Sequence, residues 1–281
     1  MSEKMKNLLV RTLSGVVLAV AVIGATLWSQ WSYGALLLVL LVGCMHEFYR
    51  LASRCDQRPQ RLLGMATGIV LFAINFMAVC RETAGLMRGG LLTALTAFVL
   101  LALSLMFVCE LFRREGNPAA GVGVTLAGVV YVALPVSLMC YIPQLSTPEW
   151  NPRVTVAYIA IIWANDVFAY LVGMSVGRHP LFPRLSPKKS WEGFFGGVAG
   201  AVVAGLVAAR LTGGSEWAWA GLAAVASATG VLGDLAESMF KRAAGVKDSG
   251  RIIPGHGGWL DRFDALILSA PFVFVYMLYV M

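Results

Sequence analysis

Carboxylates and cations alternate along the stretch from Ser238 to Asp264. These 27 residues hold five basic side chains and three aspartates, which are Asp248, Asp261 and Asp264. A charged run is usually only a solvated surface, but here the acids are interleaved with the bases. Converging carboxylates are common Mg²⁺ ligands, and Lys and Arg neutralise phosphate oxygens. The pattern predicts phosphoryl or nucleotidyl transfer, in which catalysis depends on positioning and charge stabilisation.

The second half of this stretch predicts backbone geometry suited to a ligand. Residues 254–258, with the sequence Pro-Gly-His-Gly-Gly, form a turn that would bring the backbone close to a bound group. Asp261 and Asp264 begin the last apolar run, where a helix N-terminus can meet an anion or hold carboxylates near a metal. No Ser-His-Asp arrangement is present nearby, and His256 is the only histidine of this stretch that could act as a general base.

Two further aspartates lie inside apolar runs. Asp166 is in the middle of one run, and Asp234 is near the end of another. Ionisable residues within a membrane are costly, which makes them candidates for function. The alternative for each is a hydrogen bond between helices that satisfies the carboxylate.

The composition identifies the kind of element that must position these residues. Of the 281 residues, 58% are hydrophobic and 13% are charged, and the mean hydropathy is +0.75. A soluble domain carries about 25% charged residues, and disorder requires low hydrophobicity. The chain is therefore predicted to be an integral membrane protein. Its five cysteines include no C-x-x-C pair and are interpreted as small buried side chains.

Membrane spans of about 20 apolar residues must be helical, because the bilayer offers no water to the backbone. Nine such runs occur, at about residues 9–28, 33–49, 62–80, 89–109, 121–142, 154–175, 194–213, 217–236 and 263–281. The fold class is therefore all-α, with about nine transmembrane helices. Residues 1–150 are predicted to be a scaffold of five helices, and residues 151–281 a catalytic half with longer polar loops. Small residues in the run 194–213 favour close helix packing.

The distribution of basic residues predicts the orientation of the helices. With a cytoplasmic N-terminus, 18 of the 22 Lys and Arg residues fall in cytoplasmic segments and 4 fall outside. The positive-inside rule favours this arrangement. The net charge of +7 is attributed to these loops rather than to nucleic-acid binding.

The charged stretch resembles the signature of phosphatidate cytidylyltransferases (CDP-diacylglycerol synthases). The matching positions are Ser238, Lys241, Arg242, Lys247, Asp248, Pro254, His256, Gly257, Gly258, Asp261, Arg262 and Asp264. Segments upstream also resemble the family, including Asn165-Asp166, Gly177-Arg178 and residues 186–193. The resemblance covers about residues 155–264, whereas the first 150 residues match only as a hydrophobic scaffold.

The resemblance implies that CTP and phosphatidate react with Mg²⁺ to give CDP-diacylglycerol and pyrophosphate. It implies Asp234 and Asp261 as metal ligands, assisted by Asp248 or Asp264. Asp166 would organise a lysine or bind a second cation. The residues expected to contact substrate are Lys188, Lys189, Ser190, Ser238, Lys241, Arg242, Lys247, Arg251, His256 and Arg262. Glu192 and Glu237 are as suited to pairing with nearby cations as to binding metal.

The expected setting is a bacterial cytoplasmic membrane, with the active site facing the cytoplasm. The expected partners are CTP, phosphatidate and the lipid bilayer, without nucleic acid, and a homodimer would be an ordinary assembly. A transporter could also carry intramembrane aspartates, although here the polar residues gather on one predicted side. A CTP-dependent lipid-alcohol kinase would need similar metal and phosphate groups together with a base. A purely structural membrane scaffold would leave the charged stretch unexplained.

Overall fold

The computed structural model describes residues 3–80, 90–114, 116–145, 149–255 and 257–281. Within these residues, nine helical segments are long and apolar enough to cross a membrane, which confirms the predicted fold class. The chain divides into two compact units, residues 1–140 with 243–262, and residues 141–242 with 263–281. Each unit is described by itself.

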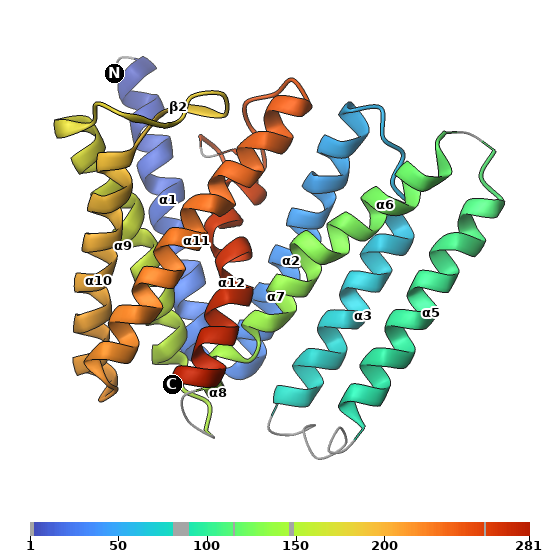
Figure 1. Cartoon of the computed structure of the whole chain (residues 1–281), viewed down its shortest axis with the longest axis horizontal. Coiled ribbons are helices and arrows are strands. Elements are labelled where there is room, and N and C mark those ends of the chain that lie inside the picture. Colours follow the sequence, from blue (N-terminus) through green and yellow to red (C-terminus); the bar gives the residue numbers. More distant parts are fainter. Residues whose placement is uncertain (1–2, 81–89, 115, 146–148, 256) are drawn as a thin grey trace. The chain divides into compact units, whose positions relative to one another are not determined.

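The first unit is built from long helices. Its elements are α1 (Glu3–Trp28), α2 (Gln30–Arg54), α3 (Arg61–Val79), α5 (Leu91–Leu111), α6 (Pro118–Gly128), the π-helix η1 (Val129–Ala133) and α7 (Leu134–Met139). The segment α6–η1–α7 is one continuous span that packs against α2 and α3 (Figure 1). The π-helical turn ends at Ala133, two residues before Pro135, which cannot donate a backbone hydrogen bond.

Local sequence signals set several helix starts. Ser29 and Ser32 form a reciprocal capping box at the start of α2. Asn117 accepts hydrogen bonds from Ala119 N and Ala120 N, and Pro118 follows it as the first residue of α6. Helix α2 provides much of the core, since Leu41 and Met45 have no exposed surface.

The outer helices of this unit present apolar side chains outward. Leu13 of α1 is 66% exposed and Phe107 of α5 is 62% exposed. Such surfaces are costly in water and favourable in lipid hydrocarbon, which agrees with membrane insertion.

The second unit carries α8 (Ile142–Leu145), α9 (Pro152–Val176), α10 (Trp191–Thr212), α11 (Glu216–Ala243) and α12 (Leu260–Val280), the last two crossing its boundaries. An antiparallel hairpin, β1 (Pro180–Phe182) and β2 (Ser186–Ser190), joins α9 to α10 (Figure 1). Gly196 faces Val172, and Gly200 faces Phe168, across the α9–α10 contact. The predicted close packing of these small residues is confirmed.

Two helix boundaries differ from the predictions in a way that matters for the site. The apolar run expected to end near residue 236 continues as helix to Ala243, and the last helix begins at Leu260 rather than at 263. Hydropathy falls before the helix ends because polar residues occupy the last two turns of α11. There, the i,i+4 pair of Glu237 and Lys241 is compatible with continued helix.

Candidate functional site

Three carboxylates converge in the second unit. Asp234 and Glu237 of α11 and Asp264 of α12 each place an oxygen atom within 4.8 Å of the others. Glu237 and Asp264 are buried, at 1% and 8% exposure, while the side chain of Asp234 is 39% exposed. Among the described residues this is the group of acids that could hold a metal ion.

Helix periodicity and small residues bring these acids together. Asp234 and Glu237 are three residues apart, so they lie on one face of α11. Gly233 is in close contact with α12, because a Cβ atom at Gly233 would lie 2.5 Å from the carbonyl oxygen of Asp264. Asp264 is held by its own helix, since its Oδ1 accepts a hydrogen bond from Ala265 N at 2.7 Å.

Two lysines pair with the acids of this cluster. Lys189 Nζ of β2 lies 2.5 Å from Asp234 Oδ2, and Lys241 Nζ lies 2.5 Å from Glu237 Oε2. When the three carboxylates are ionised, the two lysines leave one negative charge unbalanced. This net negative charge favours the binding of a cation, and carboxylate oxygens are the ligands that Mg²⁺ prefers.

The hairpin that supplies Lys189 is fixed to the start of α10. Ser190 caps α10 by accepting a hydrogen bond from Gly193 N at 3.1 Å. Glu192 accepts hydrogen bonds from Arg178 N and His179 N, at 3.1 and 3.3 Å, and pairs with the His179 ring. The predicted substrate contact of Ser190 stays a prediction beside this capping role.

The part of the family signature that runs from Ser249 to Asp261 lies in the first unit and is called the signature loop here. It is built around Asp261. Asp261 Oδ2 accepts three hydrogen bonds, from Ser249 N at 2.9 Å, Ser249 Oγ at 2.9 Å and Gly258 N at 2.8 Å. Between Ser249 and Gly258 the chain turns back on itself, and Ile253 N donates a hydrogen bond to Gly257 O at 3.0 Å. Gly257 has φ of +88°, which a glycine adopts without strain.

A second carboxylate, Glu47 of α2, holds the same loop and was missed by the sequence analysis. Glu47 has no exposed surface, and its Oε2 accepts a hydrogen bond from Leu260 N at 2.9 Å. It also lies 2.8 Å from Ser249 Oγ, whose single proton it shares with Asp261 Oδ2. Gly250 and Gly258 pack against the carboxylate so closely that a Cβ at either would collide with it. One signal could have found Glu47, because it is an ionisable residue inside an apolar run, like Asp166.

The other predicted residues are distributed as follows. Ser238 donates a hydrogen bond to Asp234 Oδ1 at 3.3 Å, so it belongs to the α11–α12 cluster. Asp166 is exposed on α9 and lies outside that cluster, with Asn165 Nδ2 at 3.4 Å from its Oδ1. His256 lies outside the described residues. The remaining charged candidates are exposed, namely Lys188, Arg242, Lys247, Asp248, Arg251 and Arg262.

Taken together, the apolar helices define a polytopic membrane protein, and its second unit gathers three carboxylates that could hold a metal ion beside two lysines. Comparison with known proteins gives the family. A model described as "Cytidylyltransferase family" matches residues 9–280, and the chain belongs to this family.

Curated relatives agree with this assignment. The chain is similar to a "Phosphatidate cytidylyltransferase" of Brucella abortus, at 35% identity over 97% of this chain and 94% of the relative. A protein of the same name from Mycobacterium bovis is 40% identical over 52% of this chain and 48% of its own length. One from Mycobacterium leprae is 50% identical over 42% of this chain and 38% of its own length.

Proposed function

We propose that this protein transfers a cytidylyl group from CTP to phosphatidate, giving CDP-diacylglycerol and pyrophosphate. The observation that carries the proposal is the α11–α12 cluster of three carboxylates and two lysines. The similarity to the Brucella abortus phosphatidate cytidylyltransferase, which extends over 97% of this chain and 94% of the relative, supports it. The substrates are both polyanions, so the site must offset their repulsion.

The reaction needs no strong general base. A phosphomonoester has its second pKa at about 6, so the phosphate of phosphatidate is largely dianionic at neutral pH. One of its oxygens attacks the α-phosphorus of CTP, and the bond from that phosphorus to the bridging oxygen of the β-phosphate breaks. The electron pair leaves with pyrophosphate, and the chain need only align the two phosphates and stabilise charge.

Within the second unit, Asp234, Glu237 and Asp264 would hold Mg²⁺, and their oxygen ligands fit that ion. When bound, the ion would stabilise the charge that develops on the α-phosphate and on the departing pyrophosphate. Lys189 and Lys241 already lie against these acids and would attract phosphate oxygens into the cluster. Asp166 as the site of a second cation stays a prediction.

In the first unit, Asp261 keeps its predicted role as a metal ligand on the strength of the resemblance. Its Oδ2 accepts hydrogen bonds from the loop, which hold the carboxylate in a defined orientation. Glu47 is proposed as a positioning residue, because it fixes the loop residues Ser249 and Leu260 on which the setting of Asp261 depends. The exposed cations Arg242, Lys247, Arg251 and Arg262 are proposed contacts for substrate phosphates, as predicted.

The proposed location is a bacterial cytoplasmic membrane, with the N-terminus and the charged loops on the cytoplasmic side. CTP is water-soluble and phosphatidate presents its headgroup at the interface, so both would meet at the polar ends of the helices. The charge distribution of the loops supports this orientation. A homodimer stays a prediction.

The test uses purified full-length protein, phosphatidate and CTP labelled in the cytosine ring, with and without Mg²⁺. Ring label should enter the lipid only when Mg²⁺ is present. Asp234→Asn should lower kcat by about 100-fold or more, as expected for loss of a group that organises transition-state charge. Glu216→Gln is the matched control, because Glu216 is an exposed acid of the same helix that pairs with Arg210.

Two results would refute the proposal. Transfer of the γ-phosphate without ring label would indicate a lipid kinase, and flux through proteoliposomes without product would indicate a transporter. Wild-type activity in Asp234→Asn or Asp264→Asn would remove the metal assignment, and wild-type activity in Asp261→Asn would remove that of Asp261.

A further inference from the structure

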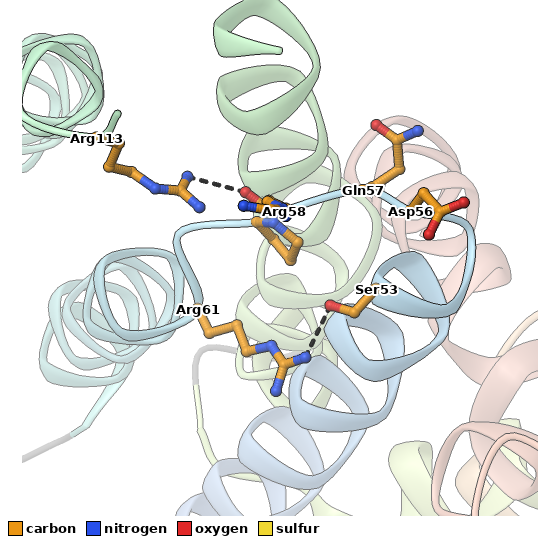
Figure 2. Close-up of a pocket in the computed structure, with 7 residues that line it drawn as sticks. Ser53, Asp56, Gln57, Arg58, Arg61 and Arg113 are labelled. Atoms are coloured by element: carbon orange, nitrogen blue, oxygen red, sulfur yellow. Dashed lines mark hydrogen bonds between the residues drawn. The ribbon is translucent and has the colours of Figure 1, made fainter. Parts of the chain in front are cut away.

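A polar cavity of about 670 Å³ opens in the first unit, where the α2–α3 connection meets the end of α5. Figure 2 shows the side chains around it. It is lined by Ser53, Asp56, Gln57, Arg58, Pro59, Arg61 and Arg113. We call it the arginine pocket, since its described lining holds three arginines and one acid, Asp56. None of the seven belongs to the proposed catalytic or substrate-binding set.

Hydrogen bonds fix two of the arginines in place. Arg61 Nη2 donates to Ser53 Oγ at 2.7 Å, and Arg113 Nη1 donates to the carbonyl oxygen of Arg58 at 2.9 Å. A guanidinium has five N–H donors, so these bonds leave most donors of Arg61 and Arg113 for other partners. Planar guanidinium groups match phosphate oxygens in pairs.

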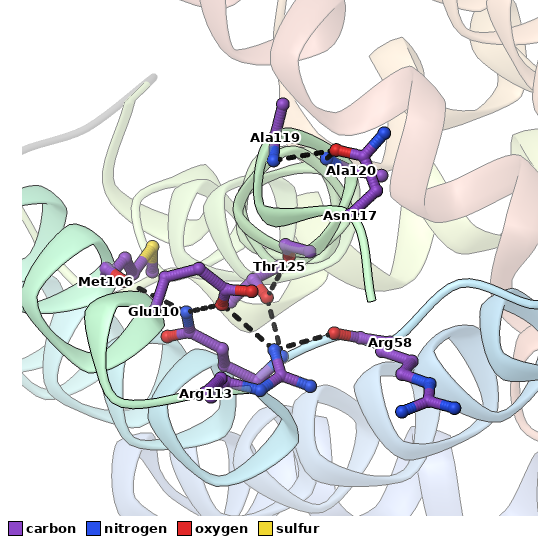
Figure 3. Close-up of polar contacts among 10 residues, drawn as sticks. Arg58, Met106, Glu110, Arg113, Asn117, Ala119, Ala120 and Thr125 are labelled. Carbon is purple, nitrogen blue, oxygen red and sulfur yellow. Dashed lines mark hydrogen bonds and ion pairs between the residues drawn. The ribbon is translucent and has the colours of Figure 1, made fainter. Parts of the chain in front are cut away.

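A buried polar network behind the pocket holds its wall (Figure 3). Glu110 of α5 is 8% exposed; it accepts a hydrogen bond from Gln60 Nε2 at 2.5 Å and pairs with Arg113 at 3.0 Å. Gln60 N in turn donates to Thr125 Oγ1 of α6 at 2.8 Å. Glu110 bonds both Gln60 and Arg113, so it orients the Arg113 side chain. Among the described lining residues, three are arginines and one, Asp56, is an acid. The pocket is therefore preorganised and positively charged.

The turn before the pocket is also locally defined. Asp56 has φ of +55°, a left-handed conformation that aspartate tolerates better than most residues. Gln57 N donates a hydrogen bond to Ala52 O at 3.2 Å, which closes this turn. The wall thus combines a fixed turn with the buried network, so little ordering would be required on binding.

The pocket lies at a helix end that also holds the signature loop. Arg50, one turn before Ser53 on α2, donates to Ser249 O at 2.5 Å. The pocket therefore lies at the same end of α2 as the loop carrying Asp261. Because α2, α3 and α5 are candidate membrane spans, their ends would lie at the boundary between bilayer and water. Basic pockets between transmembrane helices at that level bind anionic lipid headgroups.

We propose that the arginine pocket binds a phosphate oxyanion at a site separate from the proposed catalytic residues. The ligand is either the phosphodiester of an anionic lipid headgroup or a soluble phosphate. Arg58, Arg61 and Arg113 provide the charge, and Ser53 and Gln57 provide further hydrogen-bonding groups. Occupation of this pocket does not depend on turnover, so its test stands apart from that of the proposed function.

The lipid source is tested on full-length protein in nanodiscs of phosphatidylcholine with a minor share of phosphatidylglycerol, an anionic lipid that is not the proposed substrate. Native mass spectrometry would count the phosphatidylglycerol molecules retained on the protein. The double variant Arg58→Gln/Arg61→Gln should retain one fewer, with affinity lowered about tenfold per guanidinium removed. Arg114→Gln is the matched control, since Arg114 is exposed at the same helix end and outside the pocket.

The soluble source is tested by equilibrium dialysis of the detergent-solubilised protein against radiolabelled inorganic phosphate. Saturable binding that the double variant loses and Arg114→Gln keeps would assign the pocket to soluble phosphate. Arg61→Gln alone provides a milder variant, because glutamine can still bond Ser53. If the double and single variants match Arg114→Gln in both experiments, the pocket holds only solvated arginines and the proposal is wrong.

Discussion

Replacement of Glu47 should loosen the loop that carries Asp261 without unfolding the protein. The carboxylate accepts two buried hydrogen bonds from that loop, from Ser249 Oγ and Leu260 N. Each hydrogen bond to a charged group contributes about 1.5–3 kcal/mol. Ser249 Oγ can still donate to Asp261 Oδ2 when Glu47 is gone, so part of the loss is recovered.

The net cost for Glu47→Ala is then about 2–4 kcal/mol, which raises the local opening equilibrium of the loop about 30-fold to 700-fold. Glu47→Gln keeps the shape and one acceptor oxygen with neutral hydrogen bonds, so its effect should be nearer tenfold. The two substitutions therefore give a graded pair. Activity with CTP and phosphatidate should fall in the same order if the loop geometry sets the position of Asp261.

Hydrogen exchange measured by mass spectrometry on peptides covering residues 249–260 would report the opening directly. Glu110→Ala is the matched control, because Glu110 is a second buried glutamate of this unit that bonds Gln60 and Arg113 instead of the loop. It should lower stability while leaving exchange in the loop unchanged. Wild-type exchange and activity in Glu47→Ala would refute the positioning role.

Two further predictions concern helix packing and topology. Gly233→Ala places a Cβ against the backbone of Asp264, so we expect a loss of about 1–3 kcal/mol in stability and reduced activity, measured by thermal unfolding in detergent and by the ring-label assay. Gly123→Ala is the control, because a Cβ at that position has no neighbour within 4 Å. It should be neutral or stabilise α6 by up to about 1 kcal/mol. Equal losses of stability in the two variants would contradict the packing account. For topology, the native cysteines are replaced and single cysteines are introduced at Arg114 and Arg153. Membrane-impermeant thiol reagents should label these two positions from opposite faces, with position 114 on the cytoplasmic face. Labelling of both from one face would overturn the proposed orientation.

The sequence predicted the helices well because the bilayer imposes a strong local requirement. Each span needs about 20 apolar residues, and that length is visible without any tertiary information. The predicted boundaries were weakest at α11, where helix continues past the apolar run to Ala243. Hydropathy measures the fit to lipid, whereas backbone hydrogen bonds decide where a helix ends.

The candidate site was predicted in part. Asp234 and Asp264 were chosen from the charge pattern and the family resemblance, and they lie together with Glu237, which the sequence left undecided between ion pairing and metal binding. The pairing of Lys189 with Asp234 could not be derived from spacing, because 45 residues separate the two. The roles predicted for Asp166 and Asp261 as metal ligands stay predictions.

By itself the sequence determined the membrane class, the count of spans and the stretch in which the chemistry is concentrated, since all three depend on composition along short windows. Only the tertiary structure decided that Glu47 holds a loop more than 200 residues later, and that Arg58 and Arg61 line one pocket together with Arg113. Such contacts depend on which helix faces meet. Side chains far apart in the chain carry no periodic signal of their mutual distance, so folding alone brings them together.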